Sequence, residues 1–176
     1  MLDLPVLSAD GVCLRKLVRE DAPSLQFHAD NVLVHRNMFD GFPHPYTLND
    51  ALSWCTEGAH SKQMGYVWGI EYEAQIIGCI GLVPESGWLR CNAEIGYWIG
   101  QAYWGRGITS KALTLVMSWA ESSLCEVTRF YAPIFAWNAG SQSVARKNGF
   151  HQEAVLKKSA IKSGVLIDRV VWAKYR

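Results

Sequence analysis

The sequence lacks the features of several protein classes. Its 176 residues contain no apolar run approaching the roughly eighteen residues of a membrane span, and Met1–Pro5 lacks the basic start of a signal peptide. Seventeen basic and sixteen acidic residues nearly balance, with no run of like charge that would indicate a nucleic-acid arm or a polybasic membrane patch. We therefore expect a cytoplasmic protein whose main partner is neither nucleic acid nor a membrane.

Disulfide frameworks and metal sites are not indicated either. The cysteines are odd in number, scattered, and without a Cys-x-x-Cys pair: Cys13, Cys55, Cys79, Cys91 and Cys125. This spacing argues against disulfides and zinc, so we expect reduced thiols. The five histidines show no metal-ligand spacing and are expected at the surface or in a pocket. No metal is expected.

The composition is sufficient for one hydrophobic core. Hydrophobic residues make up 49% of the chain and aromatic residues 12%, which suits one globular domain over residues 1–176. Periodicity predicts strands near 12–18, 66–72, 75–83, 92–100, 127–132, from 150 onward and 165–174. It predicts helices near 19–31, 47–62, 108–122 and 141–147.

The stretch from 92 to 122 has the order strand, glycine turn, helix. Residues 92–100 alternate as a strand does, residues 101–107 form a turn with two glycines, and Ile108 begins a helical pattern. The first N–H groups of a helix have no internal partner and carry the positive end of its dipole, which suits phosphate. A helix entered through glycines is therefore a candidate pyrophosphate site.

Three residues of the turn support this hypothesis, although glycine turns between strand and helix are common. Gly105 and Gly107 remove side chains where the backbone would approach an anion, and Arg106 adds a fixed charge. The turn does not match a P-loop, which ends in Gly-Lys-Ser/Thr. It also lacks the three spaced glycines of a dinucleotide fingerprint.

The segment Trp104-Gly-Arg-Gly-Ile-Thr109 resembles the Arg/Gln-x-x-Gly-x-Gly/Ala loop of the GNAT superfamily of N-acetyltransferases. Two of the three marked positions depart from that pattern, Trp104 and Thr109. The tryptophan in Tyr-Trp-Gly-Arg-Gly is typical of the ribosomal-protein N-terminal acetyltransferases of RimJ/RimL type. A second block, Asn138–Phe150, is similar to the family's Asn-x-x-Ser segment and the helix ending in Gly-Phe. The resemblance extends over nearly the whole chain.

This resemblance implies an α/β (α+β) fold of a single domain. A central mixed, mostly antiparallel sheet of six to seven strands would be flanked by about four helices. The sheet would splay between its fourth and fifth strands, residues 92–100 and 127–132. The co-substrate would be acetyl-CoA, with its pantetheine arm lying in that splay as an added strand would. No metal takes part.

The resemblance also assigns residues to the co-substrate. The expected contacts are Tyr97, Ile99, Trp104, Gly105, Arg106, Gly107, Ile108, Thr109, Ser110, Asn138 and Ser141. Asn138 would bond the pantetheine amide, or would be an ordinary turn asparagine. Arg146 and Lys147 would reach the adenosine phosphate, or would form a solvated helix end.

Three positions are candidates for the chemistry. A backbone N–H at Ile99 would stabilise the oxyanion that develops during transfer. Ser141 would donate the proton to the departing thiolate, because the tyrosine used by other members falls on Ala145; the alternative is that Ser141 only caps its helix. Glu94, an acid in an apolar strand, would act as the base or would only bind the acceptor's charge.

The acceptor is indicated only by the branch that the chain resembles. That branch implies a protein N-terminal α-amine, with a small amine such as an aminoglycoside, polyamine or amino acid as the alternative. A non-catalytic acetyl-CoA sensor is a further alternative. Residues 32–46, rich in aromatics and proline, are expected to form one wall of the acceptor pocket, with His44 the histidine best placed to contact the acceptor. We expect a monomer or a homodimer.

Overall fold

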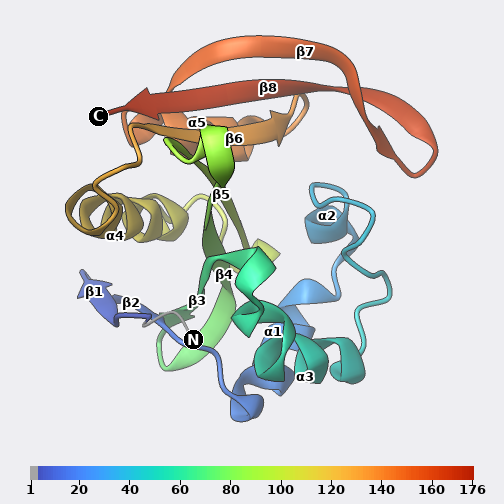
Figure 1. Cartoon of the computed structure of the whole chain (residues 1–176). Helices are drawn as coiled ribbons and strands as arrows, with labels where there is room; N and C mark the ends of the chain where they lie inside the picture. The colour runs from blue at the N-terminus through green and yellow to red at the C-terminus, as the bar shows by residue number, and fades with distance from the viewer. Residues whose placement is uncertain (1–3) are drawn as a thin grey trace.

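The computed structural model describes residues 4–176 and organises them around one eight-stranded sheet in the order β1-β2-β3-β4-β5-β6-β8-β7 (Figure 1). The strands are β1 (Leu7–Ala9), β2 (Val12–Arg15), β3 (Tyr66–Tyr72), β4 (Gln75–Pro84), β5 (Asn92–Ile99), β6 (Arg129–Phe135), β7 (His151–Lys162) and β8 (Val165–Tyr175). Neighbouring strands are antiparallel except β5 and β6, which are parallel. The predicted mixed, mostly antiparallel sheet is confirmed.

Helices cover both faces of this sheet. They are α1 (Ala22–Ala29), α2 (Val32–His35), α3 (Leu48–Thr56), α4 (Ile108–Ser123) and α5 (Ala139–Lys147). In Figure 1, α4 lies on one side of β3 to β5, and α1 and α3 lie on the other. Among residues 4–176, no helix is long and apolar enough to cross a membrane.

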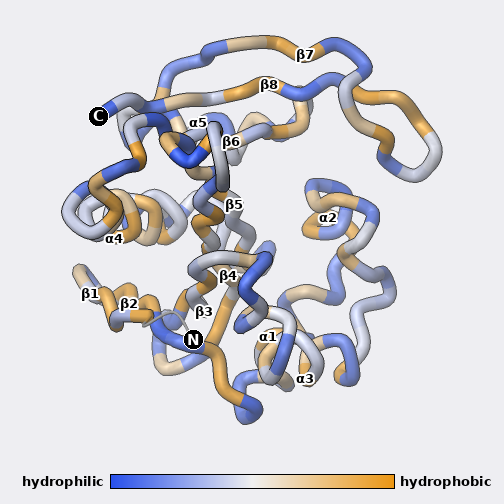
Figure 2. Tube along the Cα trace, in the orientation of Figure 1, coloured by the Kyte–Doolittle hydropathy of each residue, from blue (hydrophilic) through white to orange (hydrophobic). Residues whose placement is uncertain are grey.

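Strand β4 contributes to two hydrophobic cores because successive side chains of a strand point to opposite faces. Ile77 belongs to the core under α4, and Ile76 belongs to the core under α1 and α3. A strand buried on both faces has a continuous apolar sequence, as 76–82 does here. Figure 2 shows hydrophobic stretches running through β2 and β4 between the helices.

Helix α3 begins at its predicted cap and ends earlier than predicted. The Thr47 hydroxyl accepts a hydrogen bond from the Asp50 N–H (3.2 Å), and the Asp50 carboxylate accepts one from the Thr47 N–H (2.8 Å). This reciprocal capping box fixes the start. The α-helix ends at Thr56 instead of near residue 62, and two short 3₁₀ turns follow it.

Two short elements were missing from the sequence prediction. Strand β1 joins β2 through Asp10 and Gly11, whose φ angles are 50° and 80°. Asp-Gly with two positive φ angles is a strong hairpin signal, so β1 had a local signature. Helix α2 lies inside the predicted loop 32–46, and Asn31 caps it by accepting from the Leu33 N–H (2.8 Å). The α/β fold class is confirmed, with eight strands and five α-helices.

Strands β5 and β6 separate where the prediction placed the splay. They pair only through 92–94 and 129–131; from there to their ends, 95–99 and 132–135 form no further rungs with each other. The Arg129 N–H donates to the Cys91 carbonyl (3.0 Å). Alternate residues of a strand face the same side, so position 133 also faces β5, and there Pro133 has no N–H to donate. Pro133 therefore gives a physical reason for the end of the ladder.

Candidate active site

The edge of β5 at the splay presents the backbone of Ile99. The Gly100 N–H donates to the Ile77 carbonyl toward β4 (2.8 Å), so the peptide groups of Ile99 point the other way, toward the splay. The Ile99 carbonyl accepts a hydrogen bond from Trp104 Nε1 at 2.9 Å. No rung of the described sheet uses the Ile99 N–H on that side. This is the orientation that an oxyanion donor requires.

Close packing of β4 against β5 holds Ile99 in this position. A Cβ atom at Gly78 would lie 2.1 Å from the Trp98 carbonyl oxygen and 2.7 Å from the Ile99 Cα. Atoms do not approach so closely, so only glycine allows the two strands to meet here. The position of Ile99 therefore depends on Gly78 of the neighbouring strand having no Cβ atom.

The glycine turn enters α4 as predicted. Gly105 and Gly107 have φ angles of 75° and 78°, and a Cβ atom at either would meet nothing within 4 Å. The first hydrogen bond of the helix joins the Lys111 N–H to the Gly107 carbonyl (3.1 Å). The N–H groups of the three residues between them, 108–110, lie before that bond and have no partner within the helix.

The side chains of this turn have structural contacts of their own. The Trp104 indole ties the turn to β5 through its bond with Ile99. The Arg106 guanidinium lies 5.3 Å from the centre of the Tyr103 ring, a cation–π contact. The Ser110 hydroxyl accepts from the Asn148 amide (2.9 Å), which joins α4 to the end of α5. A role for Trp104, Arg106 or Ser110 toward a co-substrate stays a prediction.

The start of α5 lies across the splay from β5. The Asn138 side chain caps the helix by accepting from the Ser141 N–H (3.1 Å), and the Tyr97 hydroxyl donates to the Ser141 carbonyl (2.8 Å). Burial raises the pKa of Tyr97, so its phenol stays protonated and keeps donating. Tyr97, Asn138 and Ser141 are thus brought together, as the resemblance implies.

These contacts identify the cap of α5, and the donor role of Ser141 stays a prediction. The prediction left open that Ser141 only caps its helix, but the structure gives that role to Asn138. Within residues 4–176, no hydrogen bond uses the Ser141 hydroxyl. The cap occupies the side-chain oxygen of Asn138 and leaves its amide N–H groups for another partner.

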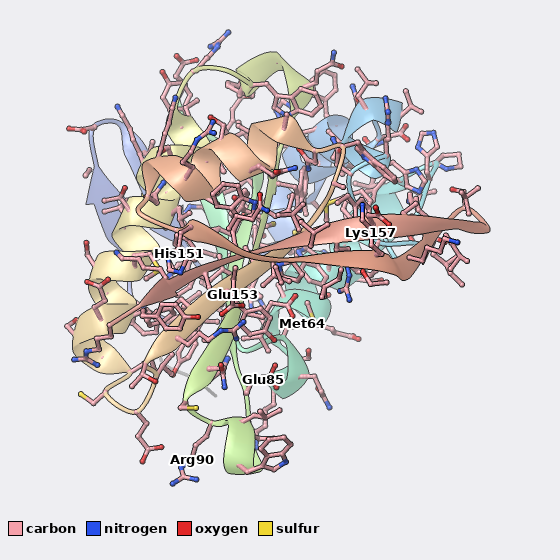
Figure 3. The ribbon with its side chains drawn as sticks, turned by 90° about the horizontal axis from the view of Figure 1, so that it is seen from above. Met64, Glu85, Arg90, His151, Glu153 and Lys157 are labelled. Carbon is pink, nitrogen blue, oxygen red and sulfur yellow. The ribbon has the colours of Figure 1, made fainter. Side chains whose placement is uncertain are left out.

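Glu94 belongs to a small acidic group on the face of the sheet that α1 and α3 cover. The Tyr131 hydroxyl donates to the Glu85 carboxylate (2.6 Å; Glu85 is labelled in Figure 3), and Tyr131 is also close enough to Glu94 to affect the pKa of that carboxyl. The Glu94 side chain is exposed, although the neighbouring strands partly desolvate it. This desolvation raises its pKa and the charge of Glu85 adds to the rise, whereas Tyr131 and the charge of Arg169 act in the opposite direction. A raised pKa suits a general base.

A pocket of about 410 Å³ lies between the α2 segment and the β7–β8 hairpin. Its lining comes from both and from the turn between β6 and α5: Val32, His35, Arg36, Trp137, Lys162, Ser163, Val165 and Ile167. Figure 1 shows the hairpin crossing the top of the molecule and reaching toward α2. The first residues of the segment 32–46 therefore form one wall of a pocket and the hairpin forms another, which the sequence did not indicate. That this pocket receives the acceptor stays a prediction.

Among the histidines, the prediction of a surface or pocket position is wrong for His28, and the predicted contact of His44 with the acceptor stays a prediction. His35, not His44, lines the pocket, and His44 stacks behind it with ring centres 4.9 Å apart. His28 is buried rather than exposed, and burial lowers its pKa. His60 Nε2 lies within 3.1 Å of two main-chain carbonyls. In the part of the chain that the structure describes, no group of three or more His, Cys, Asp or Glu side chains is arranged to hold a metal ion.

Comparison with known proteins identifies the class of this site. Residues 12–151 match the family model described as an acetyltransferase (GNAT) domain. The chain belongs to the GNAT acetyltransferase family. The relative YoaA of Bacillus subtilis (strain 168), an uncharacterized N-acetyltransferase, is 30% identical over 173 residues, which cover 96% of each protein.

Other GNAT relatives support the branch. The ribosomal-protein-serine acetyltransferase of Escherichia coli (strain K12) is 32% identical over 116 residues, covering 65% of this chain and 63% of that protein. RimL, a ribosomal L7/L12 alpha-N-protein acetyltransferase solved with coenzyme A, has a TM-score of 0.83 at 20% identity, covering 97% of this chain and 98% of its own.

MccE, a microcin C7 self-immunity acetyltransferase solved with acetyl-CoA and AMP, has a TM-score of 0.83 at 22% identity, covering 96% of this chain and 94% of its own. At these identities, the likeness to RimL and MccE shows the fold. Together, these comparisons confirm the resemblance to the GNAT family and to its RimJ/RimL-type members, and the chain is an N-acetyltransferase by class.

Proposed function

We propose that the protein transfers an acetyl group from acetyl-CoA to a primary amine, preferably the N-terminal α-amine of a protein, in the cytoplasm. The observation that carries this proposal is the splay, which has the inward backbone of Ile99 on one side and the start of α5, held to Tyr97 through the Ser141 carbonyl, on the other. The five cysteines are free, which suits a reducing compartment.

The co-substrate would be held mainly by backbone. The N–H groups of Ile108, Thr109 and Ser110 would receive the pyrophosphate, with Gly105 and Gly107 leaving the approach open. The amide of Asn138 and the free edge of β5 beside Tyr97 would bond the pantetheine arm. Acetyl-CoA supplies the activated acetyl group, and the chain supplies position and proton transfer.

Two residues would move the protons. Glu94, with its raised pKa, would take a proton from the acceptor ammonium, and the neutral amine would then attack the acetyl carbon. The Ile99 N–H would stabilise the developing oxyanion. Ser141 would donate a proton to the departing thiolate. An α-amine titrates near pH 7.7 to 8.0, so it needs far less help from a base than a lysine does.

The acceptor is proposed from the relatives and from the charges near the pocket. The E. coli relative acts on a ribosomal protein by its name, and RimL on an α-amine. A polycationic acceptor would need free carboxylates, but Asp40 pairs with Lys162 (3.1 Å) and Asp50 caps α3. Among the acids of residues 32–60, this leaves Glu57. A protein N-terminus is therefore favoured over an aminoglycoside or a polyamine.

Thiol release from acetyl-CoA tests the proposal. A panel of short peptides with varied N-termini would be compared with spermidine and an aminoglycoside, and mass spectrometry would locate the acetyl group. Acetylation of a peptide α-amine is expected. Turnover with small amines only would contradict the acceptor, and tight coenzyme A binding without any turnover would favour a sensor over an enzyme.

A further inference from the structure

We propose that the pocket between α2 and the β7–β8 hairpin binds a carboxylate of the acceptor, so that the enzyme prefers peptides with an acidic side chain close to the N-terminal amine. This inference rests on the proposed function and adds a specificity to it. It is carried by the charges that line the pocket, by its apolar walls and by its place on the sheet.

The lining is cationic. Arg36 and Lys162 both face the pocket, and no Asp or Glu residue lines it. The Arg36 guanidinium lies 5.9 Å from the centre of the Trp137 ring, and no carboxylate within residues 4–176 pairs with it. An arginine held over a ring keeps its N–H groups available for a carboxylate.

Lys162 has one donor left for a ligand. Its side chain is only 7% exposed, and its ammonium contacts Asp40 (3.1 Å) and His35 Nε2 (3.3 Å). Burial and the charge of Lys162 lower the pKa of His35, so the imidazole stays neutral and its Nε2 can accept. An ammonium has three N–H groups, and these two contacts use two of them. The third remains for an anion in the pocket.

The walls define the rest of the ligand. Val32, Val165 and Ile167 line the pocket with the face of Trp137, and the first two are more than half exposed. Apolar side chains that border the unpaired Arg36, with the remaining N–H of the Asp40-paired Lys162 beside it, suit a carboxylate carried on a short aliphatic stem, as in glutamate or aspartate. A simple inorganic anion would leave these walls in contact with water.

The pocket opens on the face of the sheet that carries Glu94. Phe135 pairs with Arg169 across β6 and β8, and Arg169 is among the charges that act on Glu94. Ile167 lies two residues from Arg169 and so on the same face, and the Trp137 ring is 5.2 Å from that of Phe135. Strands β5 and β6 run parallel from the pair Glu94 and Tyr131, so Ile99 and Phe135 lie at the same end of the splay. A peptide whose amine reaches the proposed thioester position beside Ile99 therefore lies near the pocket, with Glu94 farther back along β5.

Matched peptides test the inference. Three peptides would differ only at the second residue, Glu, Gln or Lys, and kcat/KM would be measured by thiol release. The native enzyme is expected to prefer Glu over Gln by about tenfold, the scale of one charge-assisted hydrogen bond. Arg36→Gln should bring this ratio toward one, and Arg36→Glu should make the Lys peptide the better substrate. A phosphoserine peptide that outperforms Glu would still support an anion site, with phosphate as its preferred group.

Arg90→Gln is the matched control. It removes the same charge from the turn between β4 and β5, where Arg90 faces Glu126, far from the hairpin tip (Figure 3). It should leave the Glu to Gln ratio unchanged. Equal rates for the three peptides with the native enzyme would overturn the anion site while leaving the acetyltransferase intact, whereas absence of turnover on every amine would overturn the proposed function itself.

Discussion

Replacing Gly78 with alanine places a methyl group where β4 and β5 already touch. The new Cβ would lie 2.1 Å from the Trp98 carbonyl oxygen, and atoms of this kind need at least 3.0 Å, so the strands must separate by about 0.9 Å. The Cβ also meets the Ile99 Cα at 2.7 Å, so β5 is pushed away from β4 at that residue. The displaced backbone is the proposed oxyanion donor.

Two magnitudes follow from this displacement. Overpacking of a tight contact costs about 1–3 kcal/mol of folding free energy, and in a domain of this size each kcal/mol lowers Tm by about 2–4 °C. A shift of about 1 Å in a group that positions the reaction can lower the rate by about 100-fold. Gly78→Ala should therefore lose more activity than its modest loss of stability explains.

Gly81→Ala is the matched control on the same strand. A Cβ there would meet its nearest neighbour, the Tyr66 carbonyl oxygen, at 3.6 Å, an ordinary contact. Thermal unfolding and acetyl-CoA-dependent thiol release would be measured for both variants at a temperature where both are folded. Equal Tm and equal kcat/KM for the two variants would refute the argument that Gly78 sets the position of Ile99.

Three further predictions concern the proposed chemistry. Ser141→Ala should lower kcat with little change in coenzyme A affinity, whereas Ser143→Ala in the same helix should not; full activity across the pH range would exclude Ser141 as the donor. Glu94→Gln should remove the acid limb of the kcat/KM profile, because a base with a raised pKa is inactivated by protonation at a higher pH than an ordinary glutamate. A higher KM with an unchanged profile would mean that Glu94 only binds the acceptor. Gly107→Val should abolish coenzyme A binding in calorimetry, while Gly87→Val, at another positive φ, should cost only stability.

The shape of the glycine turn and of the helix start could be predicted because its determinants are local in sequence. The turn 101–107 and the first residues of α4 lie next to each other in the chain, and two glycines with an apolar helix pattern are enough to indicate their shape. The Thr47 cap of α3 was predictable for the same reason. The Asp10-Gly11 hairpin was equally local, and its omission was an error of interpretation rather than a lack of signal.

The acceptor side could not be predicted, because it is assembled by contacts between distant segments. Lys162 meets His35 across 127 positions, and nothing in the alternation of β7 distinguishes this lysine from the exposed ones beside it. Glu85 and Tyr131 also lie 46 positions apart. Such contacts depend on strand order and register, which periodicity alone does not determine. The aromatic and proline residues of 32–46 predicted a pocket wall there, but the residues of this segment that line the pocket are Val32, His35 and Arg36.

The splay itself combines both kinds of information. Pro133 can be read from the sequence, but its effect depends on which neighbouring strand position 133 faces. Arg129, four residues earlier, donates its N–H to β5 and not to β8, so position 133 also faces β5 and its missing N–H affects that side. On the opposite side of β5, Gly78 draws the strand toward β4. Pro133 thus offers no N–H to β5 from the β6 side, and Gly78 permits close contact between β4 and β5 on the other side. Pairing of β5 with β6 thus ends before Ile99, and no rung of the described sheet uses the Ile99 N–H. An N–H at a fixed position without a sheet partner is what the proposed acyl-transfer site requires.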